Sequence, residues 1–199
     1  MIYFTSDLHF GHKNVIQWRP QFATIEEMDE ALIANWNETV HKDDTVIILG
    51  DLFFRNQRPA EEYLERLKGK KILIRGNHDA YWLRHWDSEK INRYFEGVHD
   101  LYGIKRDRNK LRFCHFPMVS WESSRRGSIL VCGHIHGQSS GYEFEMFKKI
   151  PAALNAGVDI NGFRPVRFSE LVENNDLFYR RVRSEEERRL LTEAAESFG

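Results

Sequence analysis

Short apolar runs alternate with amphipathic stretches along the first half of the chain. Residues 2–5, 45–49 and 71–74 are brief, largely apolar runs that stop at a polar residue or a glycine, a pattern typical of buried strands. Apolar side chains recur every three or four positions over residues 25–40, and a second amphipathic stretch runs from Pro59 to Gly69. Both stretches are predicted to be helices. The alternation of strands and helices favours an α/β layered domain.

The second half of the chain is richer in predicted strands. Two apolar stretches flank the turn-like residues 107–109 and predict a hairpin. Residues 128–132 form an apolar run that ends at Gly133, and residues 153–158 are predicted to be one more strand.

Residues 1–199 are predicted to form one domain, because no repeat, low-complexity block or linker interrupts the chain. Its core spans about residues 2–165. Residues 166–199 are a helical, charged C-terminal extension, in which Ser184 and Glu187 have the spacing of a capping box. The extension docks on the body, pairs with another subunit or frays, and the sequence leaves these three alternatives open.

Composition excludes several classes of protein. The 199 residues are 41% hydrophobic and 30% charged, with a formal net charge of −1, which argues against a domain held to nucleic acid or anionic lipid by bulk charge. Apolar runs are far shorter than the roughly 20 residues that span a bilayer. Both cysteines, Cys114 and Cys132, lie inside apolar stretches and are expected to be free thiols. With no signal segment predicted at the N-terminus, we expect a cytoplasmic protein.

Five predicted strands are followed by residues with metal-binding or catalytic side chains, mostly beside a glycine. Ligand sites in α/β sheets lie at the carboxyl ends of strands. Each short motif alone is a weak signal, whereas the five in order are specific. The side chains, in chain order, are Asp7 and His9, Asp51, Asn77 with His78 and Asp79, His115, and His134 with His136.

These side chains offer carboxylate oxygen, amide oxygen and imidazole nitrogen. That donor set suits Mn, Fe, Zn or Ni better than an all-oxygen calcium site. No cysteine belongs to the set, which disfavours a structural zinc site. The ligands are too many for one ion, but two ions about 3.5–4 Å apart that share a carboxylate would use them all.

The motif series resembles the calcineurin-like metallophosphoesterase superfamily over about residues 2–160, and its opening resembles the small single-domain phosphoesterases of bacteria and phages. The resemblance implies a four-layer α/β/β/α sandwich, with two mixed sheets flanked by helices and two divalent metal ions at one edge. It also implies the ligands. One metal is held by Asp7, His9, Asp51 and His136, and the second by the bridging Asp51 with Asn77, His115 and His134, while His78 faces the substrate.

The function implied is a metal-dependent phosphoesterase that hydrolyses phosphomonoesters or phosphodiesters. A hydroxide bridging the two ions attacks phosphorus in line, and His78 assists the leaving group. Manganese is the first choice of metal, with iron, zinc or nickel as alternatives. The expected partner is a small phosphate ester such as a nucleotide, with no membrane.

One motif departs from the pattern of the superfamily. Many members have a second aspartate three residues after the bridging one, which orients the catalytic histidine. Here Phe54 occupies that position, so His78 lacks its expected carboxylate partner, and Asp79 either stabilises the turn or contacts Arg75. Arg55 either binds a substrate phosphate or forms a surface salt bridge. The nearby His12 either lines the pocket or is an exposed polar residue.

A nuclease-like phosphodiesterase acting on nucleotides or nucleic-acid ends is the alternative enzyme. Its support is a group of aromatic and basic residues that also fits ordinary helix packing and a solvated hairpin face. A non-catalytic interaction scaffold of the same fold is disfavoured, because every ligand position holds a competent side chain. The residues in question are Trp82, His85 and Trp86, and Arg106, Arg108, Lys110 and Arg112.

Overall fold

The computed structural model describes residues 1–55 and 58–198. Its first sheet contains four parallel strands in the order β1-β2-β3-β4. The three predicted strands of the first half are confirmed. The strands are β1 (Ile2–Thr5), β2 (Thr45–Ile48), β3 (Lys70–Ile74) and β4 (Gly97–His99).

The second sheet has the order β5-β6-β7-β8. β5 and β6 form the predicted antiparallel hairpin, whereas β6, β7 and β8 are parallel neighbours. The first arm of the hairpin was predicted to begin at Val98, but Gly97–His99 form β4 and pair with β3 of the first sheet instead. The strand predicted for residues 153–158 ends at Asn155, because the Asn155 side chain accepts a hydrogen bond from the Gly157 backbone (2.8 Å) and turns the chain. The strands are β5 (Leu101–Arg106), β6 (Asn109–Cys114), β7 (Ser128–Cys132) and β8 (Ala153–Asn155).

Two mixed sheets were expected, but only the second is mixed among its four strands. The connections between β1, β2, β3 and β4 contain helices, which return the chain to run in the same direction. Antiparallel pairing at the first sheet is confined, in the described residues, to an isolated bridge between Phe4 and Val166.

The helices follow the predicted pattern, with one shorter than expected. Helix α1 (Ile25–Thr39) starts at Thr24, whose hydroxyl accepts from the Glu27 backbone (3.1 Å). The helix predicted after Pro59 is only one turn and a half long, as α2 (Ala60–Leu64). The others are η1 (Lys13–Trp18), α3 (Asp79–Leu83), α4 (Ser88–Tyr94), η2 (Ser124–Arg126), α5 (Tyr142–Lys148), η3 (Val158–Ile160), α6 (Phe168–Tyr179) and α7 (Glu185–Phe198).

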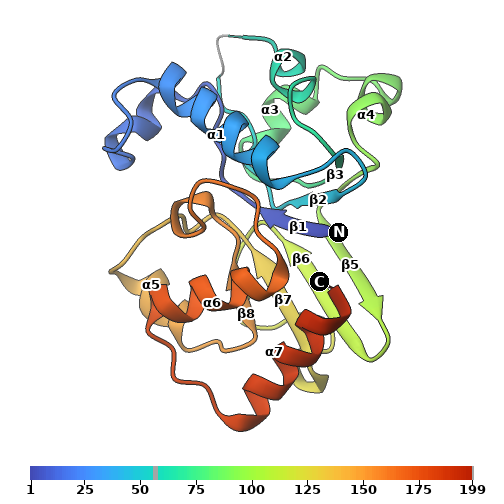
Figure 1. Cartoon of the computed structure of the whole chain (residues 1–199), viewed down its shortest axis with the longest axis vertical. Coiled ribbons are helices and arrows are strands. Elements are labelled where there is room, and N and C mark those ends of the chain that lie inside the picture. The colour runs from blue at the N-terminus through green and yellow to red at the C-terminus, as the bar shows by residue number, and fades with distance from the viewer. Residues whose placement is uncertain (56–57, 199) are drawn as a thin grey trace.

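Alternate residues of each strand pack on opposite faces, which produces the layers. In β2, Val46 and Ile48 pack against helices α1, α2 and α3, whereas Ile47 joins a central core shared with β6 and β7 of the other sheet. The outer face of the second sheet packs on Phe147 of α5 and Tyr179 of α6. Figure 1 shows α1 to α4 beside the first sheet and α5, α6 and α7 beside the second. The predicted α/β architecture, two sheets with helices on both sides, is confirmed.

The C-terminal helix docks on the body of the protein. Leu191, Ala194 and Phe198 of α7 are buried in the central core, where Phe198 packs on Phe168 (ring centroids 6.3 Å apart). Ser184 and Glu187 form the predicted capping box at its start. In the described part of the chain, no helix is both long and apolar enough to cross a membrane.

We expect Phe198→Ala to lower the free energy of unfolding by about 3 kcal/mol, because it leaves a cavity in the central core. Val182→Ala is the control, since Val182 is 94% exposed and the change should stay within about 0.5 kcal/mol. Urea denaturation of both variants measures the difference. Equal effects would show that α7 does not pack on the core in solution.

Candidate metal centre

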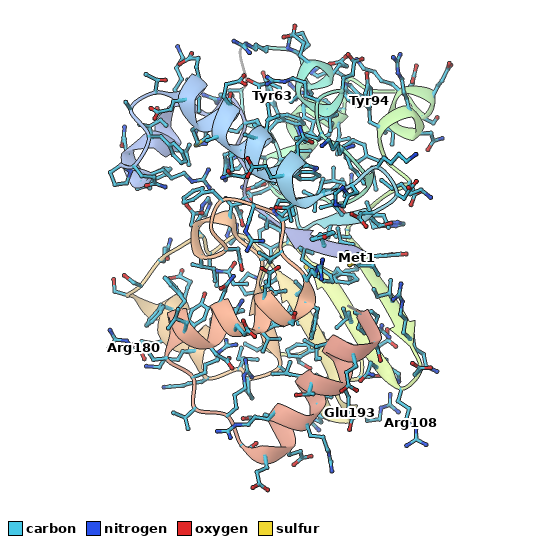
Figure 2. All side chains as sticks on the ribbon, in the orientation of Figure 1. Met1, Tyr63, Tyr94, Arg108, Arg180 and Glu193 are labelled. Carbon is cyan, nitrogen blue, oxygen red and sulfur yellow. The ribbon has the colours of Figure 1, made fainter. Side chains whose placement is uncertain are left out.

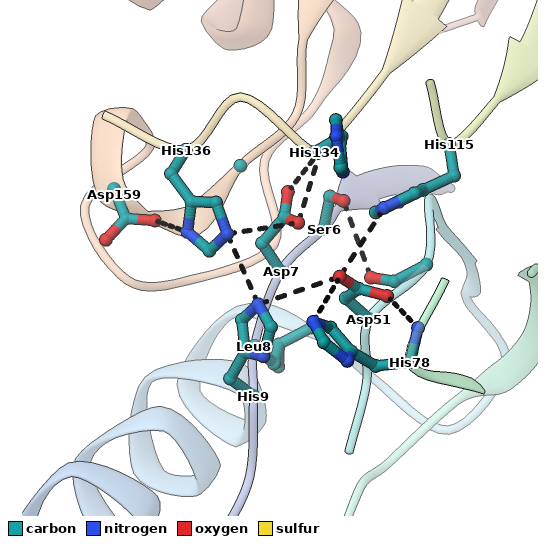
Figure 3. Close-up of polar contacts among 12 residues, drawn as sticks. Ser6, Asp7, Leu8, His9, Asp51, His78, His115, His134, His136 and Asp159 are labelled. Carbon is teal, nitrogen blue, oxygen red and sulfur yellow. Dashed lines mark hydrogen bonds and ion pairs between the residues drawn. The ribbon is translucent and has the colours of Figure 1, made fainter. Parts of the chain in front are cut away.

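The predicted ligands converge at one edge where the carboxyl ends of strands from both sheets meet. Five connections that follow β1, β2, β3, β6 and β7 supply them. Within each sheet these strands are parallel, which brings their carboxyl ends to the same edge. Figure 3 shows the side chains pointing toward one another: Asp7, His9, Asp51, His78, His115, His134 and His136.

The backbone of this site is held in an uncommon conformation. Five predicted ligands have positive φ angles between 47° and 74°, namely Asp7, His9, Asp51, His134 and His136. Such residues cost free energy that surrounding contacts must offset. Hydrogen bonds provide those contacts: the Asp7 backbone donates to Gly50 (3.0 Å) and the His9 backbone to Asp51 (3.0 Å). The His134 backbone donates to the Asp7 carboxylate (3.0 Å).

Two glycines of the motifs are required by close packing at this edge. A Cβ atom at Gly76 would collide with the Asp51 carboxylate, and one at Gly133 would collide with the Ser6 hydroxyl. Both glycines therefore let two strand ends approach closely enough for their side chains to converge.

One group of ligand atoms comes from Asp7, His9 and His136, which all lie within 4.8 Å of one another. The Nε2 atoms of His9 and His136 are 3.3 Å apart, and Asp7 Oδ1 is 3.7 Å from His136 Nε2. The two imidazole rings are stacked, 19° from parallel. The two nitrogens are within hydrogen-bond distance of each other, and together with the Asp7 carboxylate they also offer the mixed oxygen and imidazole donors that a divalent cation binds.

A second group comes from Asp51, His115 and His134. Asp51 Oδ2 is 3.5 Å from His115 Nε2 and 3.8 Å from His9 Nε2, so the Asp51 carboxylate lies between the two groups. The Asn77 amide oxygen is 3.1 Å from His115 Nε2. The seven predicted ligands therefore lie close together at this edge. A third group, of His9, Asp51 and His78, overlaps the other two and includes a histidine that was not predicted to be a ligand.

Electrostatics at Asp51 favour its ionised form. Burial disfavours the charge, but the contact with His115 outweighs it and lowers the pKa of Asp51 to about 2. Burial likewise disfavours a charged His115, yet the Asp51 partner raises the pKa of His115 to about 9. At His9, burial and then the neighbouring His136 lower the pKa well below its ordinary value. A divalent ion binds carboxylate and neutral imidazole, so an ion held by His115 would have to displace the proton that Asp51 favours on its ring.

Sequence reasoning missed two residues behind the first group, Asp159 and Arg19. Asp159 Oδ2 lies 3.3 Å from His136 Nδ1, which leaves Nε2 facing the site. Arg19 is fully buried and donates two hydrogen bonds to Asp159 (2.8 and 3.0 Å). It also donates to the backbone oxygens of Asp7 (2.6 Å) and Leu8 (3.0 Å). Asp159 directly follows the strand predicted for residues 153–158, so the rule that site residues follow strand ends could have found it. Nothing in the sequence marks Arg19.

Asp79 stabilises the turn, which resolves one alternative. Its buried carboxylate accepts from the backbones of Gly76, Asp51 and Leu52 at 2.8, 2.8 and 3.0 Å, and from the Trp82 indole. Arg75 instead pairs with the exposed Asp100.

His78 sits at the solvent side of the centre, and Phe54 lies beside it at the position where many family members have a second aspartate. Its Nε2 is 3.8 Å from Asp51 Oδ2, and its ring packs on Phe54 (centroids 4.0 Å apart). His12 also packs on Phe54, and its Nδ1 is 3.3 Å from that of His9. Burial, and then His78, lower the pKa of His12 to about 4.

Arg55 lies over the Phe54 ring (5.2 Å) and forms no salt bridge with another described residue.

The residues considered for nucleic-acid contact are largely engaged elsewhere. Trp82 is buried edge-on against Phe53, which favours helix packing. Arg106 donates to the Ser197 backbone and Arg112 to Glu122. Arg108 extends from the outer end of the hairpin, away from the metal edge (Figure 2).

We expect Asp159→Asn to weaken Mn²⁺ binding about tenfold, because outer partners of a metal-binding histidine set its orientation and basicity. Isothermal titration of Mn²⁺ into metal-free protein measures the change. Asp176→Asn is the matched control. Asp176 lies on α6 and accepts hydrogen bonds from Arg183 (2.6 and 2.7 Å), much as Asp159 does from Arg19. Unchanged Mn²⁺ affinity in a folded Asp159→Asn variant would refute the role of Asp159.

Comparisons with known proteins find relatives over most of the chain. An uncharacterised protein of Methanocaldococcus jannaschii is 32% identical over 176 residues, covering 86% of this chain and 89% of that protein. The gene 66 protein of Mycobacterium phage L5 is 35% identical over 158 residues, covering 67% and 76%. The crystal structure of a protein of unknown function from Aquifex aeolicus has a TM-score of 0.63 and 25% identity, covering 83% of this chain and 94% of that one.

The sequence model described as calcineurin-like phosphoesterase matches residues 1–190. That match includes all seven converging ligand residues and both sheets. The chain therefore belongs to the calcineurin-like phosphoesterase family.

Proposed function

We propose that the protein is a hydrolase of phosphate esters that uses two divalent metal ions. The observation that carries this proposal is the pair of ligand groups on either side of the Asp51 carboxylate. Manganese is our first choice of metal, with iron, zinc or nickel as alternatives, because mixed oxygen and imidazole donors suit these ions. Asp7, His9, Asp51 and His136 would hold one ion, and Asp51, Asn77, His115 and His134 the other.

Two bound ions would neutralise charge on the phosphate and provide a strong oxygen nucleophile near neutral pH. Two contacts within the chain set the tautomers of predicted ligand histidines. His115 Nδ1 is 2.6 Å from the Leu49 carbonyl oxygen, and His136 Nδ1 faces Asp159. Both contacts require a proton on Nδ1, so both Nε2 atoms are free to act as ligands.

His78 is the residue proposed to protonate the leaving oxygen. Its backbone N–H donates to Asp51 Oδ1 (2.9 Å), and its side chain is 29% exposed, so it reaches the side from which a substrate would enter. The Phe54 ring packs against the His78 ring and limits its orientation, and the nearest carboxylate is that of Asp51. His12 and Arg55 flank the same Phe54 ring and are proposed to contact the substrate.

The proposed substrates are small phosphomonoesters or phosphodiesters. The proposed location of the protein is the cytoplasm. A non-catalytic scaffold has less support, because positive φ angles at five predicted ligand positions cost free energy and would have no function there if the side chains bound no ion. The nuclease-like alternative loses the support of two of its basic residues, which bind the chain itself.

Hydrolysis of p-nitrophenyl phosphate and bis-p-nitrophenyl phosphate by metal-stripped protein, with and without Mn²⁺, tests the proposal. We expect turnover only with metal, and a loss of at least about a hundredfold in Asp51→Asn, since the amide removes the charge shared by both ligand groups. The preferred substrate separates a monoesterase from a diesterase. If the protein bound no Mn²⁺ by titration and hydrolysed neither ester, the scaffold would replace this proposal.

We expect His78→Ala to lower kcat by roughly a hundredfold on methyl phenyl phosphate and far less on methyl p-nitrophenyl phosphate. General acids contribute about 10²–10⁴-fold when the leaving group needs a proton, and p-nitrophenolate departs readily without one. Steady-state kinetics with both esters measures the difference. His85→Ala is the control, because the His85 ring contacts Arg84 and Tyr81 and His85 belongs to none of the ligand groups. An equal loss on both esters would argue for a role other than proton donation.

A further inference from the structure

A cavity of about 700 Å³ adjoins the metal centre on the side of His136. Its walls come from the end of η1, the segment after β7, the segment after η3, and α6. His136 and Asp159 line it, so the cavity and the first ligand group share the His136 ring. Its volume falls in the range of small-molecule sites, about 300–1,000 Å³.

Three aromatic side chains, Trp18, Phe163 and Phe178, line this cavity. Trp18 is 67% exposed, so the faces of its ring are available to a ligand in the cavity. Its backbone is anchored beside the cavity, because the next residue is the buried Arg19 that binds Asp159. Phe163 has a φ of 56°, which is rare for an aromatic residue and typical of strained functional positions.

The polar groups of the cavity select against an anionic occupant. No lysine or arginine lines it, and Asp159 contributes a negative charge. Gln21 and Gln138 line it as well, and neither amide side chain has a hydrogen-bond partner among the described residues. Each amide offers a donor and an acceptor, as is needed to pair with the edge of a base.

We propose that this cavity binds the nucleobase of a nucleotide whose phosphate ester reaches the metal centre. The aromatic rings provide surfaces on which any base can stack. The amides of Gln21 and Gln138 can form hydrogen bonds with the edge of the base. This inference rests on the proposed phosphoesterase function and names its substrate class.

A second cavity, of about 510 Å³, lies on the Arg55 side and includes Tyr81, Trp82 and Trp86. Its two tryptophan rings already have partners, whereas Trp18 of the first cavity has no ring contact with a described residue. Phe163 and Phe178 of the first cavity do pack on neighbours, Phe22 and Tyr179. Trp82 packs edge-on against Phe53 and donates to Asp79, and Trp86 packs on Tyr94 with Lys90 over its ring (4.6 Å). This cavity is therefore the weaker site for a base.

The test compares two diesters that differ only in the retained group, thymidine 5′-(p-nitrophenyl phosphate) and methyl p-nitrophenyl phosphate, with Mn²⁺ present. We expect the wild-type protein to prefer the nucleoside ester by more than tenfold in kcat/KM. Trp18→Ala should reduce this preference roughly tenfold, the effect of losing one base–aromatic stack. Tyr81→Ala, from the second cavity, is the matched control and should keep the preference. A wild-type preference near one, or an unchanged preference in Trp18→Ala, would overturn the inference.

Direct binding separates failure of this inference from failure of the proposed function. If neither diester is hydrolysed, titration with thymidine 5′-monophosphate still reports on the cavity. Binding weakened at least fivefold by Trp18→Ala but not by Tyr81→Ala supports the inference, and absent or equal binding refutes it. If the methyl ester is hydrolysed without nucleoside preference, the phosphoesterase proposal stands alone.

The base could belong to a free nucleotide or to the end of a strand. Inhibition of nucleoside ester hydrolysis by thymidine 5′-monophosphate and by an eight-residue oligothymidylate distinguishes them. Stronger, salt-sensitive inhibition by the oligomer indicates a strand end, and equal inhibition indicates a mononucleotide. Inhibition by neither contradicts the inference.

Discussion

The Asp51 carboxylate is the interaction on which this edge of the molecule depends. Its Oδ2 atom lies 3.5–3.8 Å from imidazole nitrogens of His9, His78 and His115, which follow three different strands. Its Oδ1 atom accepts from the His78 backbone, and its own backbone N–H is held by the buried Asp79. Removing the carboxylate would leave several buried polar groups without their partner, so the geometry of the motifs is coupled through one residue.

Local strain and local bonding balance one another around this carboxylate. The positive φ angles of the ligand residues are unfavourable in isolation, and they are maintained by backbone hydrogen bonds between the ends of β1 and β2. Close approach of these ends also needs the small residues Gly76 and Gly133. A stable layered core is what allows such an edge, because the inner strands β2, β3, β6 and β7 are paired on both sides and most of their residues are buried.

The buried Arg19 connects two features that lie apart in sequence. Its guanidinium holds Asp159 and the backbone oxygens of Asp7 and Leu8, and therefore orients His136 from behind. The same anchor positions the neighbouring Trp18 at the adjoining cavity. The ligand geometry and the proposed base site thus share one rigid support, so a change at Arg19 would affect both metal affinity and substrate preference.

The sequence by itself determined the α/β class, the strands of the first half, the hairpin and the residues at the strand ends, because these depend on local periodicity and on short motifs. It also marked Phe54 as a departure. Tertiary structure alone decided that the first sheet is parallel and that α7 packs on the central core. It also decided that Asp79 caps backbone groups and that Arg19 and Asp159 support His136. Those contacts join residues up to 140 positions apart. They could not be predicted, because a local pattern of side chains does not show which distant residues meet in the fold.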